Sequence, residues 1–169
     1  MMRFVRWTSA PLAAAALLAL AAPIAHADAI RITGAGPRGG LSITPDQLVL
    51  GGQLSMSVAP EWSVDPNLEL GFGDGESDWG VNVDAFYHAR LANSDWRPYV
   101  GGGIGINTVS VDLPAPFRDI TDTGLGLNAV VGFTIPSKSG HLWFTELRLG
   151  LGDLMPDLKL IGGINLNLK

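Results

Sequence analysis

After its first 27 residues, the chain contains eight short runs in which apolar and polar residues alternate. In the clearest run, residues 79–91, Val81 and Val83 share one parity while Asn82 and Asp84 share the other. Alternation with a period of two is typical of a β-strand whose two faces have different surroundings. The other runs are residues 31–43, 48–58, 67–73, 96–107, 123–135, 141–152 and 158–169. The pattern predicts an all-β protein in which only the first run, interrupted by Gly and Pro, is weak.

Eight strands can close into an antiparallel up-and-down barrel with both ends of the chain on one side. A soluble barrel places its apolar residues inside, whereas a bilayer-spanning barrel places them outside and keeps polar residues in the lumen. We expect the second arrangement, a transmembrane β-barrel. The connections 44–47, 74–78, 108–122 and 153–157 would then face outward, and 59–66, 92–95 and 136–140 would face the periplasm.

The positions of the aromatic residues favour the membrane arrangement. Phe72 and Trp79 would lie at the outer rim, and Trp96, Phe133 and Trp143 at the inner rim. Amphipathic rings at both interfaces form the aromatic girdles of membrane barrels. The main alternative is a soluble lipocalin-like barrel that binds a small apolar ligand. The two are distinguished by which face of the strands carries the charges.

The first 27 residues resemble a secretory signal. Arg3 and Arg6 precede an apolar stretch at 10–24, and Ala25-His26-Ala27 is a small-x-small cleavage site. We therefore expect residues 1–27 to be a removable signal peptide and residues 28–169 to form one barrel domain. The expected location is the outer membrane of a bacterium.

The composition excludes several classes of function. Sixteen acidic residues against 11 Lys and Arg leave no basic patch, so nucleic acid is not an expected partner. Without cysteine there is neither a disulfide framework nor a thiolate site. The spacing of Asp74, Glu76 and Asp78 resembles a calcium loop, but the turn glycine and the distant glutamate are missing. We expect neither a metal nor another cofactor.

Several charged residues share the polar parity and are predicted to line the lumen. They are Glu69, Asp84, His88, Arg90, Glu146, Arg148 and Lys159. An eight-stranded barrel is narrow enough for side chains to fill it, and unpaired buried charges are costly. We therefore expect these charges to pair and plug the lumen, with Lys159 beside Glu146 and either Asp84 or Glu69 beside Arg148. The alternative is an ion path through the same residues.

No catalytic residues are predicted. Asp84 and His88 lie four residues apart on one strand face, about 13 Å by the strand rise, so they cannot chelate one metal by themselves. No serine lies in a nucleophile-elbow pattern. A small lipid-modifying barrel enzyme remains a further alternative, and a His–Ser hydrogen bond near the outer rim would be its sign.

Four segments together carry a resemblance to a known family. Residues 96–107, WRPYVGGGIGIN, resemble the PYVGGGxG strand of small OmpA-like outer-membrane β-barrels, and residues 44–51, 66–73 and 142–150 are similar to other strands of that group. The resemblance implies a non-enzymatic, monomeric eight-stranded barrel surrounded by outer-membrane lipid and inserted by the outer-membrane assembly machinery. It implies no shared active site. Barrels of the family often end in an aromatic residue, whereas this chain ends in Lys169.

Overall fold

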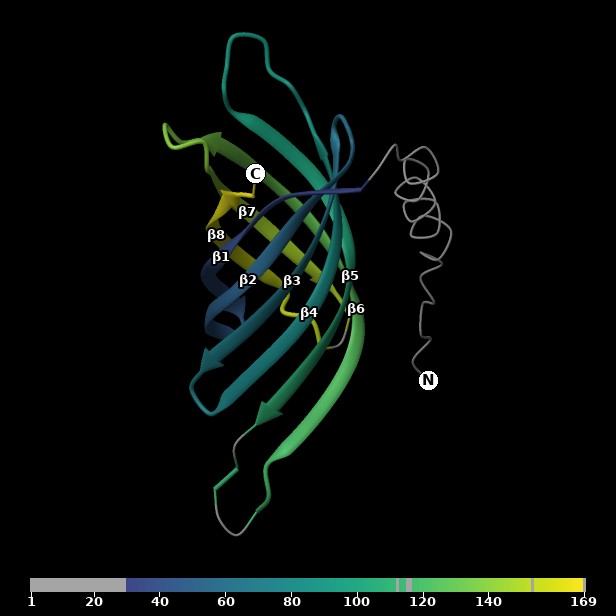
Figure 1. The fold of residues 1–169 in the computed structure, drawn as a ribbon. Coiled ribbons are helices and arrows are strands. Elements are labelled where there is room, and N and C mark those ends of the chain that lie inside the picture. Colours follow the sequence, from purple (N-terminus) through teal and green to yellow (C-terminus); the bar gives the residue numbers. More distant parts are fainter. Residues whose placement is uncertain (1–29, 112, 115–116, 153, 169) are drawn as a thin grey trace, which may run out of the picture.

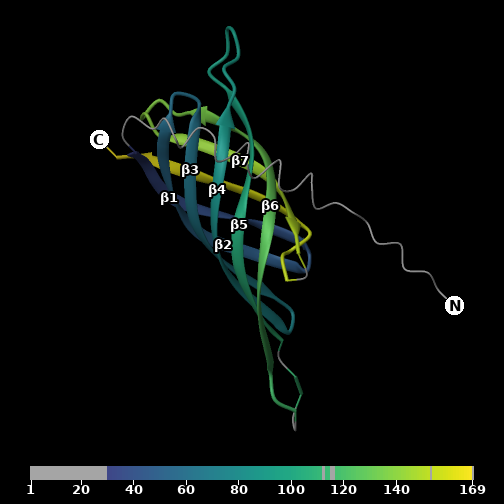
Figure 2. The same ribbon diagram turned by 90° about the vertical axis from the view of Figure 1, so that its right-hand side faces the viewer.

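The computed structural model describes residues 30–111, 113–114, 117–152 and 154–168. The predicted signal peptide lies outside these residues. The described part forms eight antiparallel strands in one closed barrel, in the order of the chain (Figures 1 and 2). The strands are β1 (Arg31–Thr44), β2 (Asp46–Ala59), β3 (Trp62–Gly73), β4 (Glu76–His88), β5 (Arg97–Val111), β6 (Ile120–Pro136), β7 (Leu142–Leu151) and β8 (Leu158–Asn167). The predicted fold class is confirmed.

The two ends of the barrel differ. The start of β1 and the end of β8 lie together with the β2–β3, β4–β5 and β6–β7 connections, and we call this the termini end (Figure 1). The other four connections lie at the opposite end, which we call the far end. There β5 and β6 project beyond the other strands as a long hairpin and stay paired as far as Val111 and Ile120 (Figure 2).

Five of the eight strands, β1, β2, β3, β5 and β6, are longer than the runs predicted for them. β1 is continuous over 14 residues despite its glycines and proline, because β2 and β8 pair with it on both sides. β3 starts at Trp62, so the expected connection 59–66 is a tight turn at Pro60 and Glu61. Pro66 fits within β3, where it pairs with Val83 of β4 while the ladder with β2 skips it. A proline is tolerated where the ladder needs no amide donor.

Glycines on the inward parity make room for long polar side chains in the lumen. Gly51 and Gly163 flank Arg38 in the sheet, and Gly51 and Gly80 flank Glu69. A Cβ atom at Gly51 would collide with the backbone of β3. These glycines therefore leave space in the narrow lumen for the side chains of Arg38 and Glu69.

Candidate functional site

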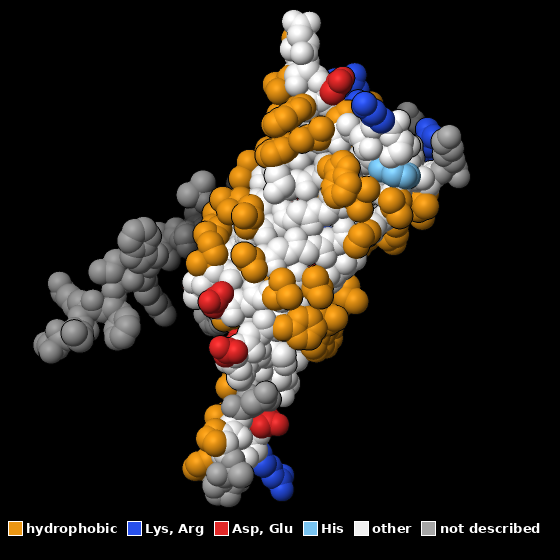
Figure 3. All heavy atoms as spheres, turned by 90° about the vertical axis from the view of Figure 1, so that its left-hand side faces the viewer, with side chains coloured by type: hydrophobic (Ala, Val, Ile, Leu, Met, Phe, Trp, Pro, Cys, Tyr) orange, Lys and Arg blue, Asp and Glu red, His pale blue; other side chains and the backbone are white. Residues whose placement is uncertain are grey.

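The inner and outer faces of the barrel wall have opposite character. On β7, the side chains of Glu146 and Arg148 are buried in the lumen, while Leu147 and Leu149 lie on the outside. Val81, Val83 and Leu125 also point outward, Leu127 is half-buried, and Asn82, Asp84 and Asn128 point inward. In Figure 3, hydrophobic side chains are spread over the wall on both sides of a central white area, and charged side chains lie toward the two ends. A soluble barrel with an apolar interior would have the reverse arrangement.

The residues predicted for the aromatic girdles lie near the two ends of the wall. Phe72 and Trp79 are exposed near the far end, where β3 pairs with β4. Trp96 and Trp143 are exposed near the termini end, and the Trp96 ring stacks on Phe133 with their centroids 5.1 Å apart. The sequence did not single out the Trp62–Tyr87 ring pair, whose centroids are 5.4 Å apart on adjacent strands at the same end.

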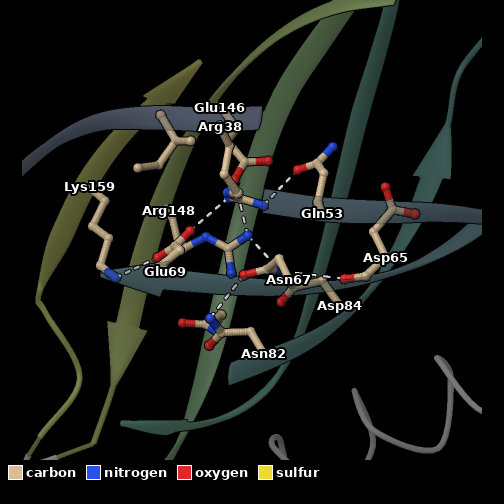
Figure 4. A network of polar contacts seen from close by, with 12 residues as sticks. Arg38, Gln53, Asp65, Asn67, Glu69, Asn82, Asp84, Glu146, Arg148 and Lys159 are labelled. Atoms are coloured by element: carbon tan, nitrogen blue, oxygen red, sulfur yellow. Dashed lines mark hydrogen bonds and ion pairs between the residues drawn. The ribbon is translucent and has the colours of Figure 1, made fainter. Parts of the chain in front are cut away.

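Two buried arginines form the centre of a charge network that crosses the lumen (Figure 4). Arg148 of β7 contacts Asp84 of β4 at 2.8 Å and Glu146 at 3.0 Å. Arg38 of β1 contacts the same Glu146 and also Glu69 of β3, the latter at 2.9 Å. All five side chains are almost fully excluded from solvent.

The network continues to the remaining strands. Lys159 of β8 contacts Glu69 at 2.7 Å. An amide chain runs from Asp84 through Asn67 and Asn82 to Asn128, with nitrogen–oxygen distances of 2.8, 3.0 and 2.9 Å. Arg38 also donates to Gln53 of β2 at 2.8 Å, and the Tyr99 hydroxyl of β5 donates to Glu146 at 3.0 Å. Side chains from all eight strands therefore meet in one connected group, in which Arg38, Arg148 and Lys159 balance Glu69, Asp84 and Glu146.

Two expectations about these charges are wrong. Lys159 does not pair with Glu146, because the β7–β8 register places it opposite Arg148, a like charge, and its side chain reaches across the lumen to Glu69. Arg90 is not a lumen residue. It lies two residues beyond the end of β4, its side chain is 71% exposed, and its guanidinium is 3.5 Å from Glu61 in the β2–β3 turn.

Arg38 is a central member of the network that sequence reasoning missed. It lies between Pro37 and two glycines, in the run that appeared weakest as a strand. A signal was nevertheless present. Leu41 and Ile43 mark the outward parity of β1, and counting back from Ser42 in steps of two places Arg38 inward.

The remaining predicted residue, His88, lies in the lumen near the termini end. It is half-buried at the end of β4, and its Nε2 lies 3.0 Å from the Ser63 hydroxyl of β3. Its ring centroid is 5.3 Å from that of Tyr99. The His–Ser pair is therefore inside the barrel at the termini end, and not near the outer rim where a lipid-modifying enzyme would present it.

A cavity of about 340 Å³ occupies the termini half of the lumen. The charge network forms its floor through Gln53 and Glu146, and Asp65 lies beside them. Its wall includes the rings of Phe86, Tyr99 and Phe144, with Ser55, Ser63 and His88 between them. Arg97 and Asn167 lie among the lining residues near the termini end.

The far half of the lumen is filled. The β7–β8 connection folds over its mouth, with Met155 buried at 8% exposure against Gly105, Gly126 and Gly150. The carbonyl of Leu154 accepts a 2.7 Å hydrogen bond from Asn107, which anchors this connection to β5.

Within the described residues, no group of three or more His, Asp or Glu side chains is arranged to hold a metal ion. The same part of the chain has no helix of the length and hydropathy needed to cross a membrane.

Comparisons with known proteins identify solved structures that have a similar fold. No family model matches the sequence, and no curated protein matches it. Among solved structures, the N-terminal β-barrel domain of Pseudomonas aeruginosa OprF superposes with a TM-score of 0.64 at 13% identity, covering 82% of this chain and 100% of that domain. Neisserial surface protein A superposes with a TM-score of 0.60 at 14% identity, covering 82% of this chain and 96% of that one. The chain thus has the fold of the small OmpA-like outer-membrane β-barrels.

Proposed function

We propose that this protein is an integral, monomeric outer-membrane barrel with a closed lumen, and that it serves the envelope structurally or through its loops rather than by catalysis. The membrane location is supported by the outward apolar side chains and by aromatic rings near both ends of the wall. Outer-membrane lipid would cover this surface, and the outer-membrane assembly machinery would insert the barrel. Strands can cross a bilayer only as a closed barrel, in which all backbone groups are paired and the outer face is apolar.

The observation that carries the closed lumen is the connected charge network. Three cations and three carboxylates from five strands meet in the centre of the barrel, and hydrogen bonds link them to the other three strands. Moving an ion through this point would require separating desolvated ion pairs, which is costly. The Met155 segment adds a second closure at the far end.

A non-catalytic role is supported by where the reactive groups lie. The Ser63–His88 pair is enclosed by the strands, where membrane lipid on the outer face does not reach it. The β5–β6 hairpin instead projects beyond the other strands (Figure 1), and its connection carries exposed residues such as Phe117 and Arg118. This hairpin is the part best placed to meet another envelope component.

Two measurements on the purified protein test the proposal. A membrane barrel should migrate on a gel at different apparent masses before and after boiling, because the closed barrel resists detergent until heated. In planar lipid bilayers, the wild-type protein should leave conductance at the background of the empty bilayer. Large, stable open-channel currents would overturn the closed lumen in favour of a pore, and extraction of the protein from cells without detergent would overturn the membrane location.

A further inference from the structure

The strongest unassigned feature is the cavity in the termini half of the lumen, and in particular the carboxylate of Asp65 beside its floor. Asp65 is 6% exposed. It accepts a 2.6 Å hydrogen bond from the Ser55 hydroxyl, and its other carboxylate oxygen has no hydrogen-bond donor among the described residues. None of the ion pairs in the described part of the chain includes it.

The neighbouring network cannot neutralise this carboxylate. Arg38, Arg148 and Lys159 are already matched by three carboxylates of their own. In Figure 4, Asp65 lies at the edge of the group, away from both guanidinium groups. Arg97 also lines the cavity, but it is exposed and forms no ion pair with Asp65. Among the described residues, Asp65 is therefore a buried carboxylate without a paired cation, which is unfavourable unless it takes up a proton or a positively charged ligand.

Aromatic rings line the same cavity. The centroids of Phe86 and Tyr99 are 5.0 Å apart, and Ser63 pairs with Phe86 in the β3–β4 register, one inward position from Asp65. A cation gains from a desolvated aromatic surface as well as from a carboxylate. Hydroxyl and amide groups from Ser63, Gln53 and Asn165 complete the lining and can accept or donate hydrogen bonds to a ligand.

We propose that this cavity binds a small organic ammonium ion, with Asp65 as the counter-charge and the Phe86 and Tyr99 rings as the apolar wall. The volume of about 340 Å³ is within the range of small-molecule sites. A bare metal ion fits less well, because the described residues hold no cluster of three candidate ligands. The inference goes beyond the envelope role and does not depend on whether the lumen conducts.

The test compares two probes of nearly equal shape, 4-fluorobenzylammonium and 4-fluorobenzyl alcohol. Each is titrated into the refolded full-length barrel in maltoside micelles, which carry no charge, and the bound fraction is followed by fluorine NMR against empty micelles. The wild-type protein should bind the ammonium probe saturably and at least tenfold more tightly than the alcohol. Equal affinities, or no saturable binding of the ammonium probe, would overturn the proposal.

Variants then locate the site. Asp65→Asn keeps the shape and the Ser55 contact but removes the charge, so the ammonium affinity should fall at least tenfold. Asp74→Asn removes one charge from the exposed β3–β4 turn and should change it less than twofold. Phe86→Leu, which keeps the carboxylate, should weaken binding several-fold and serves if Asp65→Asn fails to refold. Wild-type affinity in both Asp65→Asn and Phe86→Leu would place the probe elsewhere and reject the site.

Discussion

The same eight strands surround both halves of the lumen, but the two halves differ in how their charges are paired and how fully they are filled. In the central part, Arg38, Arg148 and Lys159 pair with Glu69, Asp84 and Glu146, and Met155 fills the far mouth. In the termini part, a cavity of about 340 Å³ remains, and Asp65 has no ion-pair partner among the described residues. One part of the lumen is therefore closed by side chains, while another part, surrounded by the same strands, keeps a cavity. The filled half supports stability and blocks passage, whereas the hollow half leaves a charge available to a ligand.

The largest expected change in the free energy of unfolding comes from removing one cation of the charge network. Arg148→Met removes the cation shared by Asp84 and Glu146 and leaves Asp84 without its ion-pair partner. Breaking a buried pair in this way costs about 3–5 kcal/mol. Unfolding by urea in lipid vesicles measures the loss. In the hollow half, Asp65→Asn removes a charge that has no partner, so the free energy of unfolding should stay the same or rise.

A matched arginine outside the lumen provides the control for Arg148. Arg90→Met makes the same substitution at a surface pair with Glu61, where the nitrogen–oxygen distance is 3.5 Å and the arginine side chain is 71% exposed. Exposed pairs contribute about 0–1 kcal/mol. Similar losses for Arg148→Met and Arg90→Met would contradict a network that depends on buried, desolvated charges.

The next prediction compares the loss of stability when an arginine is placed on the outer face at two different heights along the barrel. Leu147 lies on the outer face between the network residues Glu146 and Arg148, whereas Leu166 lies near the end of β8. If the filled half spans the middle of the bilayer, Leu147→Arg should destabilise the barrel in vesicles by about 2–4 kcal/mol, and Leu166→Arg by about 0–1 kcal/mol near the interface. Equal losses at both positions would show that the two halves do not lie at different depths.

The sequence was sufficient for the barrel and for the two faces of its wall, because alternation is a local property of each strand. Leu147 and Arg148 are adjacent in the chain, and their opposite orientations follow from the pleat alone. The partners across the lumen could not be predicted in the same way, because they depend on strand register and barrel closure. Lys159 shows the difference: its inward parity was readable, but its contact with Glu69 depends on a register that places it opposite Arg148. The cavity was not foreseen, since it depends on how far each inward side chain reaches.

Tyr99 belongs to both halves of the lumen, and its substitution gives the most specific expected effect. Its hydroxyl donates to Glu146 of the network at 3.0 Å, while its ring lines the cavity. Tyr99→Phe removes only the donor, and Glu146 keeps both of its arginines, so unfolding in vesicles should become easier by about 1–2 kcal/mol. Because the ring remains, the affinity for 4-fluorobenzylammonium should change less than twofold. Tyr99→Leu, which removes donor and ring together, should lose both stability and affinity. If Tyr99→Phe alone reduced the affinity tenfold, the cavity would depend on the network beneath it, and the two halves could not be treated as independent.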